Sequence, residues 1–251
     1  MNCRLLPYQI ADGPTNMAID EALLEAVAQD SSVAYLRTYG WSAPTLSLGY
    51  FQRWADAEAE PRWRAVAKIR RPTGGGAILH DNELTYALIV PASHPLARPN
   101  TALYQAVHRA FGDILAGRNV EARRFGDLNP TAERPPPASR PFLCFADRDG
   151  EDLIFQGAKI VGSAQRRRAG AILQHGSLLL GRSPAAPELP GVADLADADN
   201  APQAWSALVA ESLCEALGMT PVAGDLPEGF HERVDRLKHT VYCRDSWNER
   251  R

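Results

Sequence analysis

The sequence predicts an α/β fold of the α+β kind, in which a mixed β-sheet is flanked by helices. Helical and strand patterns alternate along the chain without the regular strand–helix–strand order of a parallel sheet. The 251 residues are 45% hydrophobic and 23% charged, as in an ordinary globular protein. We find no internal repeat, so one domain over residues 1–251 is expected.

Apolar residues recur with the helical period of 3.6 in three segments: 16–29, 101–115 and 203–217. Thr15 or Asn16 is expected to open the first helix. Its apolar stripe would face the core, with Asp20, Glu21 and Glu25 turned toward solvent. The third pattern stops just before a glycine, which is typical of a helix end.

Strand patterns lie between these helices. Residues 44–50 alternate in the strand manner, and the short apolar run 84–90 predicts a buried strand. Two hairpins are expected: 152–155 with 159–161, and 171–174 with 177–180 around His175-Gly176. Residues 127–141 contain five prolines and predict a mobile surface loop.

Composition and charge exclude several classes of function. The formal net charge is −3, which does not indicate a nucleic-acid partner. No apolar run approaches the ~18 residues of a membrane span, and no signal-peptide core opens the chain. We therefore expect a cytoplasmic protein with no membrane partner. The four cysteines match no metal-binding spacing, so free thiols and no metal are expected.

The most unusual stretch is RRPTGGGAILHD at 70–81. Gly74, Gly75 and Gly76 would let backbone N–H groups approach a ligand closely. The two arginines that open the stretch would suit an anionic part of a substrate. A flexible turn flanked by solvated charges is the alternative. The stretch matches neither a phosphate-binding P-loop nor a dinucleotide-binding fingerprint.

Cys144 and Lys159 are the candidate reactive side chains. A cysteine among apolar neighbours is usually an inert core residue, and a catalytic thiol needs a nearby cation. A loop followed by a hairpin would bring Lys159 back beside Cys144. A lysine buried there would act as a base or an electrostatic partner, whereas a solvated surface lysine is the alternative.

Other polar features allow two interpretations each. Arg166, Arg167 and Arg168 form the sharpest basic run, either a solvated hairpin tip or a docking site for an acidic protein or a phosphate. His80 and His175 lie at predicted strand ends, where structural histidines are common. Serine-hydrolase and zinc-protease motifs are absent from the sequence.

Five segments in order resemble the biotin/lipoate protein ligase catalytic domain: NMAIDEAL at 16–23, RRPTGGGAILHD at 70–81, GAKIVGSAQ at 157–165, QHGSL at 174–178 and YCRDSWN at 242–248. Each motif is weak alone, but their order along the chain is specific. The resemblance runs from about residue 10 to the end. It implies a mixed sheet with flanking helices around an acyl-binding tunnel, and acyl attachment to a lysine of a lipoyl carrier domain.

Within this family the chain is most similar to octanoyltransferases of the LipM type. These have no accessory C-terminal domain and carry a Cys-Phe pair ahead of the lysine hairpin. The resemblance implies that Cys144 is the nucleophile and Lys159 its partner. It also implies a set of substrate-binding residues: Arg70, Arg71, Thr73, Gly74, Gly75, Gly76, His80, Gly162, Ser163, Ala164, Gln165 and His175.

The implied reaction moves an octanoyl group from octanoyl-acyl carrier protein through a cysteine thioester to a lipoyl carrier protein. The acceptor would be a glycine cleavage H protein or the lipoyl domain of a 2-oxoacid dehydrogenase E2. No cofactor is expected. Three alternatives remain: an ATP-dependent lipoate–protein ligase, an octanoyl amidotransferase between carrier proteins, and a non-catalytic carrier-domain binder. The basic run 166–168 is the implied dock for an acidic carrier protein.

Overall fold

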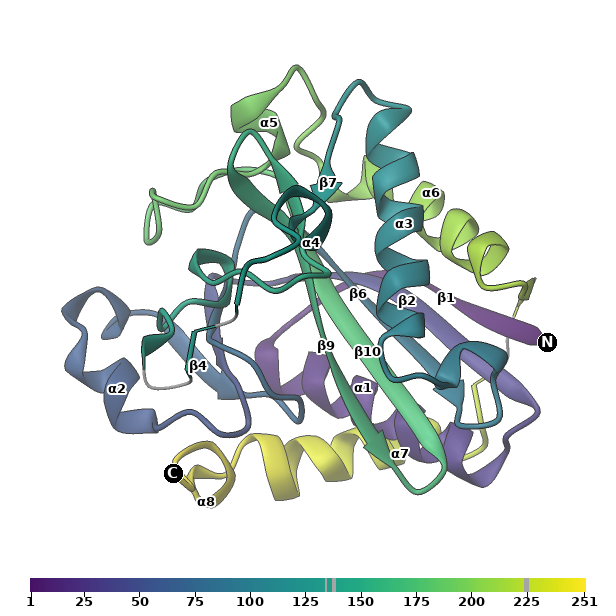
Figure 1. Cartoon of the computed structure of the whole chain (residues 1–251). Helices are drawn as coiled ribbons and strands as arrows, with labels where there is room; N and C mark the ends of the chain where they lie inside the picture. Colours follow the sequence, from purple (N-terminus) through teal and green to yellow (C-terminus); the bar gives the residue numbers. More distant parts are fainter. Residues whose placement is uncertain (134, 137–138, 224–225) are drawn as a thin grey trace.

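The computed structural model describes residues 1–133, 135–136, 139–223 and 226–251 (Figure 1). Within these residues, eight strands form one sheet in the order β11-β1-β2-β6-β10-β9-β8-β7. Their bounds are β1 Asn2–Ala11, β2 Val33–Trp41, β6 Glu83–Pro91, β7 Arg123–Arg124, β8 Leu153–Phe155, β9 Ala158–Arg168, β10 Ala171–Leu179 and β11 Thr220–Ala223. Strand β1 runs parallel to β2 and β11, and the other pairs are antiparallel. The predicted mixed sheet is therefore confirmed.

A second sheet of three strands, again among the described residues, has the order β4-β3-β5. Its strands are β3 Thr45–Leu48, β4 Ala67–Arg70 and β5 Ile78–His80. Strand β3 confirms the strand predicted at 44–50. Because β4 and β5 flank residues 71–77, this small sheet fixes both ends of the glycine-rich stretch.

Helices cover both faces of the large sheet. The longer helices are α1 Gly13–Gln29, α3 Ala102–Ala116, α6 Pro202–Ala216 and α7 Phe230–Leu237. The shorter ones are α2 Trp54–Ala59, α4 Phe125–Leu128, α5 Val192–Leu195, α8 Asp245–Asn248, the π-helical turn Lys238–Tyr242 and the 3-10 turns Pro61–Trp63, Pro95–Ala97 and Cys144–Ala146. Helix α1 packs on β6, β10 and α7, whereas α6 packs on β1, β2 and α3 (Figure 1).

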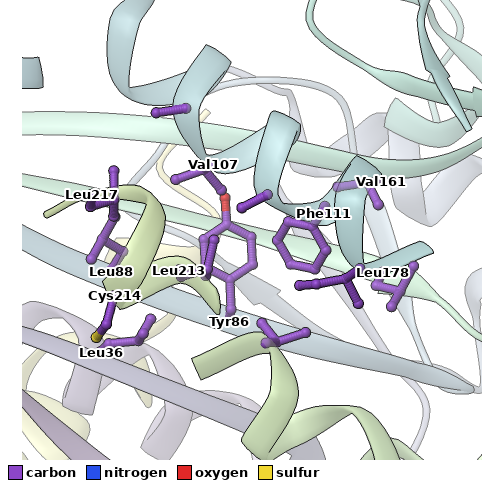
Figure 2. Packing of buried hydrophobic residues seen from close by; sticks show 14 of the residues in the cluster. Leu36, Tyr86, Leu88, Val107, Phe111, Val161, Leu178, Leu213, Cys214 and Leu217 are labelled. Carbon is purple, nitrogen blue, oxygen red and sulfur yellow. The ribbon is translucent and has the colours of Figure 1, made fainter. Parts of the chain in front are cut away.

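The larger core lies between the sheet and helices α3 and α6 (Figure 2). Tyr86 of β6 lies beside Phe111 of α3, with ring centroids 5.3 Å apart. Leu213 and Leu217 close this core from the α6 side. A second core lies between the opposite face and α1, so the central strands are buried on both sides. This explains the continuous apolar run at 84–90.

The first helix begins earlier than predicted. Asp12, not Thr15 or Asn16, is the N-cap: its carboxylate accepts a hydrogen bond from the Thr15 backbone N–H at 2.8 Å. The prediction that Asp20 and Glu21 face solvent is wrong. Both are buried, because α1 lies between the sheet and α7, where buried polar partners replace water.

The prediction of a hairpin around His175-Gly176 is also wrong. Strand β10 runs unbroken through His175, and all its residues are buried. The turn lies earlier, at Ala169-Gly170, where both residues have positive φ (49° and 83°) and join β9 to β10. The other predicted hairpin is confirmed, with its turn at Gln156-Gly157.

The proline-rich loop predicted at 127–141 includes residues 134 and 137–138, which lie outside the described residues. Its first two residues end helix α4 at Leu128. The loop leads directly into the 3-10 turn Cys144–Ala146.

Candidate active site

Cys144 opens the 3-10 turn Cys144–Ala146, and its side chain is a partly exposed free thiol. Its position is fixed by backbone bonds to the residue after the glycine triplet. The Cys144 N–H donates to the Ala77 carbonyl at 2.7 Å, and the Ala77 N–H donates to the Phe142 carbonyl at 2.8 Å. The glycine-rich stretch therefore holds the segment that presents the thiol.

Lys159, the second residue of β9, points back toward Cys144, as predicted. Its Nζ lies 3.5 Å from the Cys144 Sγ and 3.1 Å from the Cys144 carbonyl oxygen. The same Nζ forms an ion pair with Asp152 Oδ2 at 2.8 Å. Asp152 stands just before β8, so the tight β8–β9 hairpin places the carboxylate beside the lysine. The ammonium is thus held between a carboxylate and a sulfur.

Burial and charge act in opposite directions on this ion pair, in which Lys159 is 5% and Asp152 4% exposed. Burial by itself lowers the pKa of Lys159, but the Cys144 thiolate and the Asp152 carboxylate raise it more, so the pKa is above its ordinary value. Burial raises the pKa of Asp152, and Lys159 opposes that shift. Lys159 is therefore a fixed cation at neutral pH.

Gly162 leaves the space that Lys159 occupies. A Cβ at Gly162 would lie 2.5 Å from Lys159 Cε and 3.0 Å from its Nζ. Gly162→Ala is expected to lower the turnover of the reaction proposed below by about 10²-fold, because a small misplacement of a reacting group is costly. Only the flexible end of a side chain must move, so the melting temperature should change little. Steady-state rates and thermal unfolding measure the two effects.

Gly112→Ala in α3 is the matched control for Gly162→Ala, because a Cβ at Gly112 meets nothing within 4 Å. This control should keep full turnover. A Gly162→Ala enzyme with wild-type turnover would show that the Lys159 position is not critical.

The glycine triplet serves backbone packing as well as flexibility. Gly75 has φ of 92°, and its carbonyl oxygen lies 2.0 Å from where a Cβ at Gly49 would be. A Cβ at Gly76 would lie 2.9 Å from the Cys144 backbone nitrogen. Glycine is therefore required at Gly76 for the approach of Cys144.

Both arginines of this stretch are buried and donate to the backbone. Arg71 Nη2 donates to the carbonyls of Gly74 and Gly76 at 2.6 and 2.7 Å. Burial lowers the pKa of Arg71 to about 10, and the Cys144 thiolate opposes that shift. Arg70 donates to the carbonyls of Gly49, Tyr50, Gln52 and Asn248. These guanidinium groups build the loop, and their predicted contact with a substrate stays a prediction.

A buried polar network links α1, β10 and the glycine-rich stretch. Thr73 Oγ1 lies 2.6 Å from His175 Nε2, and His175 Nδ1 lies 3.0 Å from Asp20 Oδ2. Asp20 also pairs with Arg37 at 3.0 Å and accepts from the Tyr39 hydroxyl. Thr73 and His175 are therefore side chains that hold the loop against the sheet.

His80 belongs to a neighbouring network. Its Nδ1 lies 2.6 Å from Glu83 Oε1 and its Nε2 2.8 Å from Ser47 Oγ. The ring stacks on Trp41 with centroids 3.9 Å apart. Because Ser47 Oγ also accepts from Arg71, this network reaches the glycine-rich stretch from the other side.

The remaining predicted binding residues, 162–165, lie along β9. Ser163 Oγ lies 2.6 Å from both the Tyr86 hydroxyl and His108 Nε2. Gln165 donates to Gln174 at 2.7 Å. Ala164 lies opposite His175 in the β9–β10 register. Their contact with a substrate stays a prediction.

The three side chains of the basic run have different partners, and their role as a dock for an acidic partner stays a prediction. Arg168 pairs with Glu21 at 2.9 Å, and Arg167 donates to the Ala97 carbonyl at 2.8 Å. Only Arg166 turns toward the glycine-rich stretch, where it donates to the Pro72 carbonyl. Arg167 points to the opposite face of β9 from Arg166 and Arg168, because alternate residues of a strand point to opposite faces.

An apolar cavity lies beside Cys144. The cavity volume is about 20 Å³, room for about one water molecule. Ile78, Phe145 and Leu179 form its apolar wall, and Cys144 packs against the same three side chains. These side chains would contact an alkyl chain attached at the sulfur, but the free volume between them does not hold one.

Sequence reasoning missed Asp152, Asp20, Glu83 and His108. A signal was present for Asp152: a carboxylate at the start of an apolar strand, in the hairpin that carries Lys159. Asp20 was assigned to solvent, and no local motif singles out Glu83 or His108. In the part of the chain that is described, no group of three or more acidic, histidine or cysteine side chains is arranged to hold a metal ion. No described helix has the length and apolar character needed to cross a membrane.

Stability should fall in mild acid because of the buried histidines. Burial lowers the pKa of His175 and of His108 below the ordinary value. Above about pH 6.5 both side chains are neutral in the folded and in the unfolded chain. Their full contribution to the free energy of unfolding is then present. As the pH falls, the unfolded chain binds protons first and the free energy of unfolding decreases until the folded pKa values are passed.

Urea unfolding at about pH 8 and about pH 5.5 measures this effect, with lower stability expected in acid. His108→Gln should weaken the pH dependence. Equal or greater stability in acid would contradict the assignment of neutral buried histidines.

A family model for the lipoyl protein ligase A/B catalytic domain matches residues 12–187. The chain belongs to this family. The same fold is found in solved structures. A lipoate protein ligase of T. acidophilum with bound lipoic acid matches with a TM-score of 0.77 and 22% identity. The match covers 99% of this chain and 100% of the ligase chain. Lipoate-protein ligase A bound with ATP has a TM-score of 0.75 at 23% identity, with 99% of each chain covered.

Relatives with higher identity are octanoyltransferases LipM. That of Kyrpidia tusciae is 33% identical over 99% of this chain and 98% of its own length. The relative from Symbiobacterium thermophilum is 34% identical over 100% of this chain and 99% of its own length. That of Bacillus subtilis is 39% identical over 66% of this chain and 60% of its own length. The family resemblance inferred from the five motifs is therefore confirmed.

Proposed function

We propose that this LplA/B-family chain is an octanoyltransferase that carries the acyl group as a thioester on Cys144. The observation that carries the proposal is the Lys159 ammonium, 3.5 Å from the Cys144 sulfur and anchored by Asp152. A fixed cation beside a partly exposed thiol is the environment of a thiolate nucleophile. The names of the LipM relatives support the acyl group and the reaction type.

The reaction has two acyl transfers. In the first, the Cys144 thiolate attacks the carbonyl carbon of the octanoyl thioester, the new C–S bond forms and the donor leaves as a thiol after taking up a proton. In the second, a lysine amine of the acceptor attacks the carbonyl carbon of the acyl-enzyme, the C–N bond of the amide forms as the C–S bond to Cys144 breaks, and the proton released by the amine goes to the departing sulfur or to solvent. Lys159 stabilises the thiolate before the first step and again when it leaves.

The apolar side chains beside Cys144 suit this chemistry, because Ile78, Phe145 and Leu179 would contact the alkyl chain once they move apart to admit it. The thioester donor is already activated, so the proposed reaction uses no nucleotide, metal or other cofactor. The donor is octanoyl-acyl carrier protein. The acceptor is a lipoyl carrier protein, either a glycine cleavage H protein or a lipoyl domain of a 2-oxoacid dehydrogenase E2.

Donor dependence tests the proposal. Purified enzyme is incubated with a lipoyl domain and one of three donors: octanoyl-acyl carrier protein alone, free octanoate with ATP and Mg²⁺, or an octanoylated carrier domain. Octanoylation of the acceptor lysine is expected with the thioester donor only, as read by intact mass. Modification that requires ATP would make the chain a ligase. Transfer only from an octanoylated carrier domain would make it an amidotransferase, and both outcomes would overturn the proposal.

A further inference from the structure

Three arginines that the proposed chemistry does not use gather around one aromatic ring. The guanidinium of Arg250 lies 4.6 Å from the centroid of the Tyr50 ring, that of Arg166 5.7 Å and that of Arg251 6.0 Å. They come from β9 and from the segment after α8, far apart in sequence. We call Arg166, Arg250 and Arg251 the arginine cluster.

Aromatic contacts orient the arginine cluster without neutralising it. Arg250 also lies over Trp247 at 4.9 Å, and Arg251 over Phe51 at 5.3 Å. Among the described residues, no carboxylate forms an ion pair with any of the three. In contrast, their neighbour Arg168 pairs with Glu21. Guanidinium groups held together without an ion-paired carboxylate side chain attract an anion.

The positive charges of Arg250 and Arg251 act on the buried side chain of Arg70. Burial lowers the pKa of Arg70, and the charges of Arg250 and Arg251 lower it further. One nitrogen of Arg70, Nη2, is buried with no hydrogen-bond partner. Arg250 and Arg251 are exposed and Arg166 is half-buried, so an anion can reach the arginine cluster from solvent.

The glycine triplet connects this cluster to the nucleophile. A Cβ at Gly74 would lie 3.8 Å from the Phe51 ring, whereas one at Gly76 would lie 2.9 Å from the Cys144 backbone nitrogen. Gly74 and Gly76 are two residues apart, so their Cα atoms are separated by at most about 7 Å. One end of the triplet therefore adjoins Phe51, over which Arg251 lies at 5.3 Å, and the other end adjoins the Cys144 backbone.

We propose that the arginine cluster binds the phosphate of the phosphopantetheine arm that carries the octanoyl thioester. The inference rests on the proposed function, because it names what the donor offers beyond its acyl group. A phosphodiester is a compact anion that guanidinium groups bind with charge-assisted hydrogen bonds. The pantetheine arm is longer than the glycine triplet, so it spans the distance between phosphate and thioester. Phe51, 68% exposed, offers the apolar part of the arm a contact surface.

The test compares two small donors that differ only by the phosphate: S-octanoyl-pantetheine and S-octanoyl-4′-phosphopantetheine. The second-order rate of Cys144 acylation is read by intact mass. The wild-type enzyme is expected to favour the phosphorylated donor by about tenfold or more. An Arg250→Gln and Arg251→Gln double variant, which leaves the Arg166 contact with the Pro72 carbonyl in place, should lose most of this preference and keep its rate with the unphosphorylated donor.

Arg244→Gln removes one exposed charge from the same C-terminal segment and is the matched control, because Arg244 donates to the His239 carbonyl instead. It should keep the preference. Equal wild-type rates with both donors would overturn the inference and leave the proposed function standing. A double variant that is impaired only with whole octanoyl-acyl carrier protein would also overturn the inference, because it would indicate an acidic protein surface as the occupant. No Cys144 acylation by any donor would overturn both.

Discussion

Cys144→Ala is expected to lower the rate of octanoyl transfer by at least about 10³-fold, because the variant has no thiol to form the acyl-enzyme thioester. The fold should be kept, because the side chain is partly exposed and its backbone bonds to Ala77 do not involve the sulfur. The measurement is the initial rate of acceptor octanoylation together with thermal unfolding. Cys243→Ala is the control, since that thiol is exposed and lies in another part of the chain.

Transfer that survives in Cys144→Ala, or is lost equally in Cys243→Ala, would remove Cys144 from the proposed mechanism. Cys3 and Cys214 are unsuitable alternatives because both are buried in the main core.

The second large effect is expected at Lys159, where stability and activity can be separated. Lys159→Met leaves the Asp152 carboxylate buried without its cation, which costs about 3–5 kcal/mol of unfolding free energy. Lys159→Met combined with Asp152→Asn removes both charges and should recover most of that stability. Transfer should stay about 10²–10³-fold below wild type in both variants, because the cation beside the thiolate is missing.

Urea unfolding and transfer rates of the two variants, compared with wild type, measure this separation. A double variant that regains transfer along with stability would show that Lys159 only supports the fold. The observed position of the Nζ, in contact with both Asp152 and the Cys144 sulfur, predicts the opposite.

The sequence was informative where a side chain's neighbours follow from local geometry. The Gln156-Gly157 turn returns β9 alongside β8, so the approach of Lys159 to the loop containing Cys144 could be predicted from the hairpin pattern. Strand β6 was predicted because a run of apolar residues has few alternatives. The family resemblance added the pairing of Cys144 with Lys159 as an expectation, and the geometry places the two side chains in contact.

Sequence reasoning failed where buried polar groups compensate one another. Asp20 looks solvent-facing on a helical wheel, yet Arg37 and His175 from two strands meet it in the interior. His175 looked like a turn residue because glycine follows it. Gly176 is instead needed within β10, where a Cβ would lie 2.4 Å from the Gly162 carbonyl oxygen. Such contacts join residues far apart in the chain, so no local pattern contains them.

The arginine cluster shows the same limit. The run at 166–168 suggested one basic patch, but strand geometry separates its members. The charge that gathers around Tyr50 comes from Arg166 and two residues more than 80 positions away along the chain. Aromatic rings, rather than sequence proximity, organise it.

The central claim is that Cys144 carries the octanoyl group. The most direct measurement is the intact mass of the enzyme after incubation with octanoyl-acyl carrier protein, followed by peptide mapping. The account predicts one octanoyl adduct on Cys144 that hydroxylamine releases and that Cys144→Ala lacks. An unmodified Cys144 under conditions in which the acceptor lysine becomes octanoylated would contradict it.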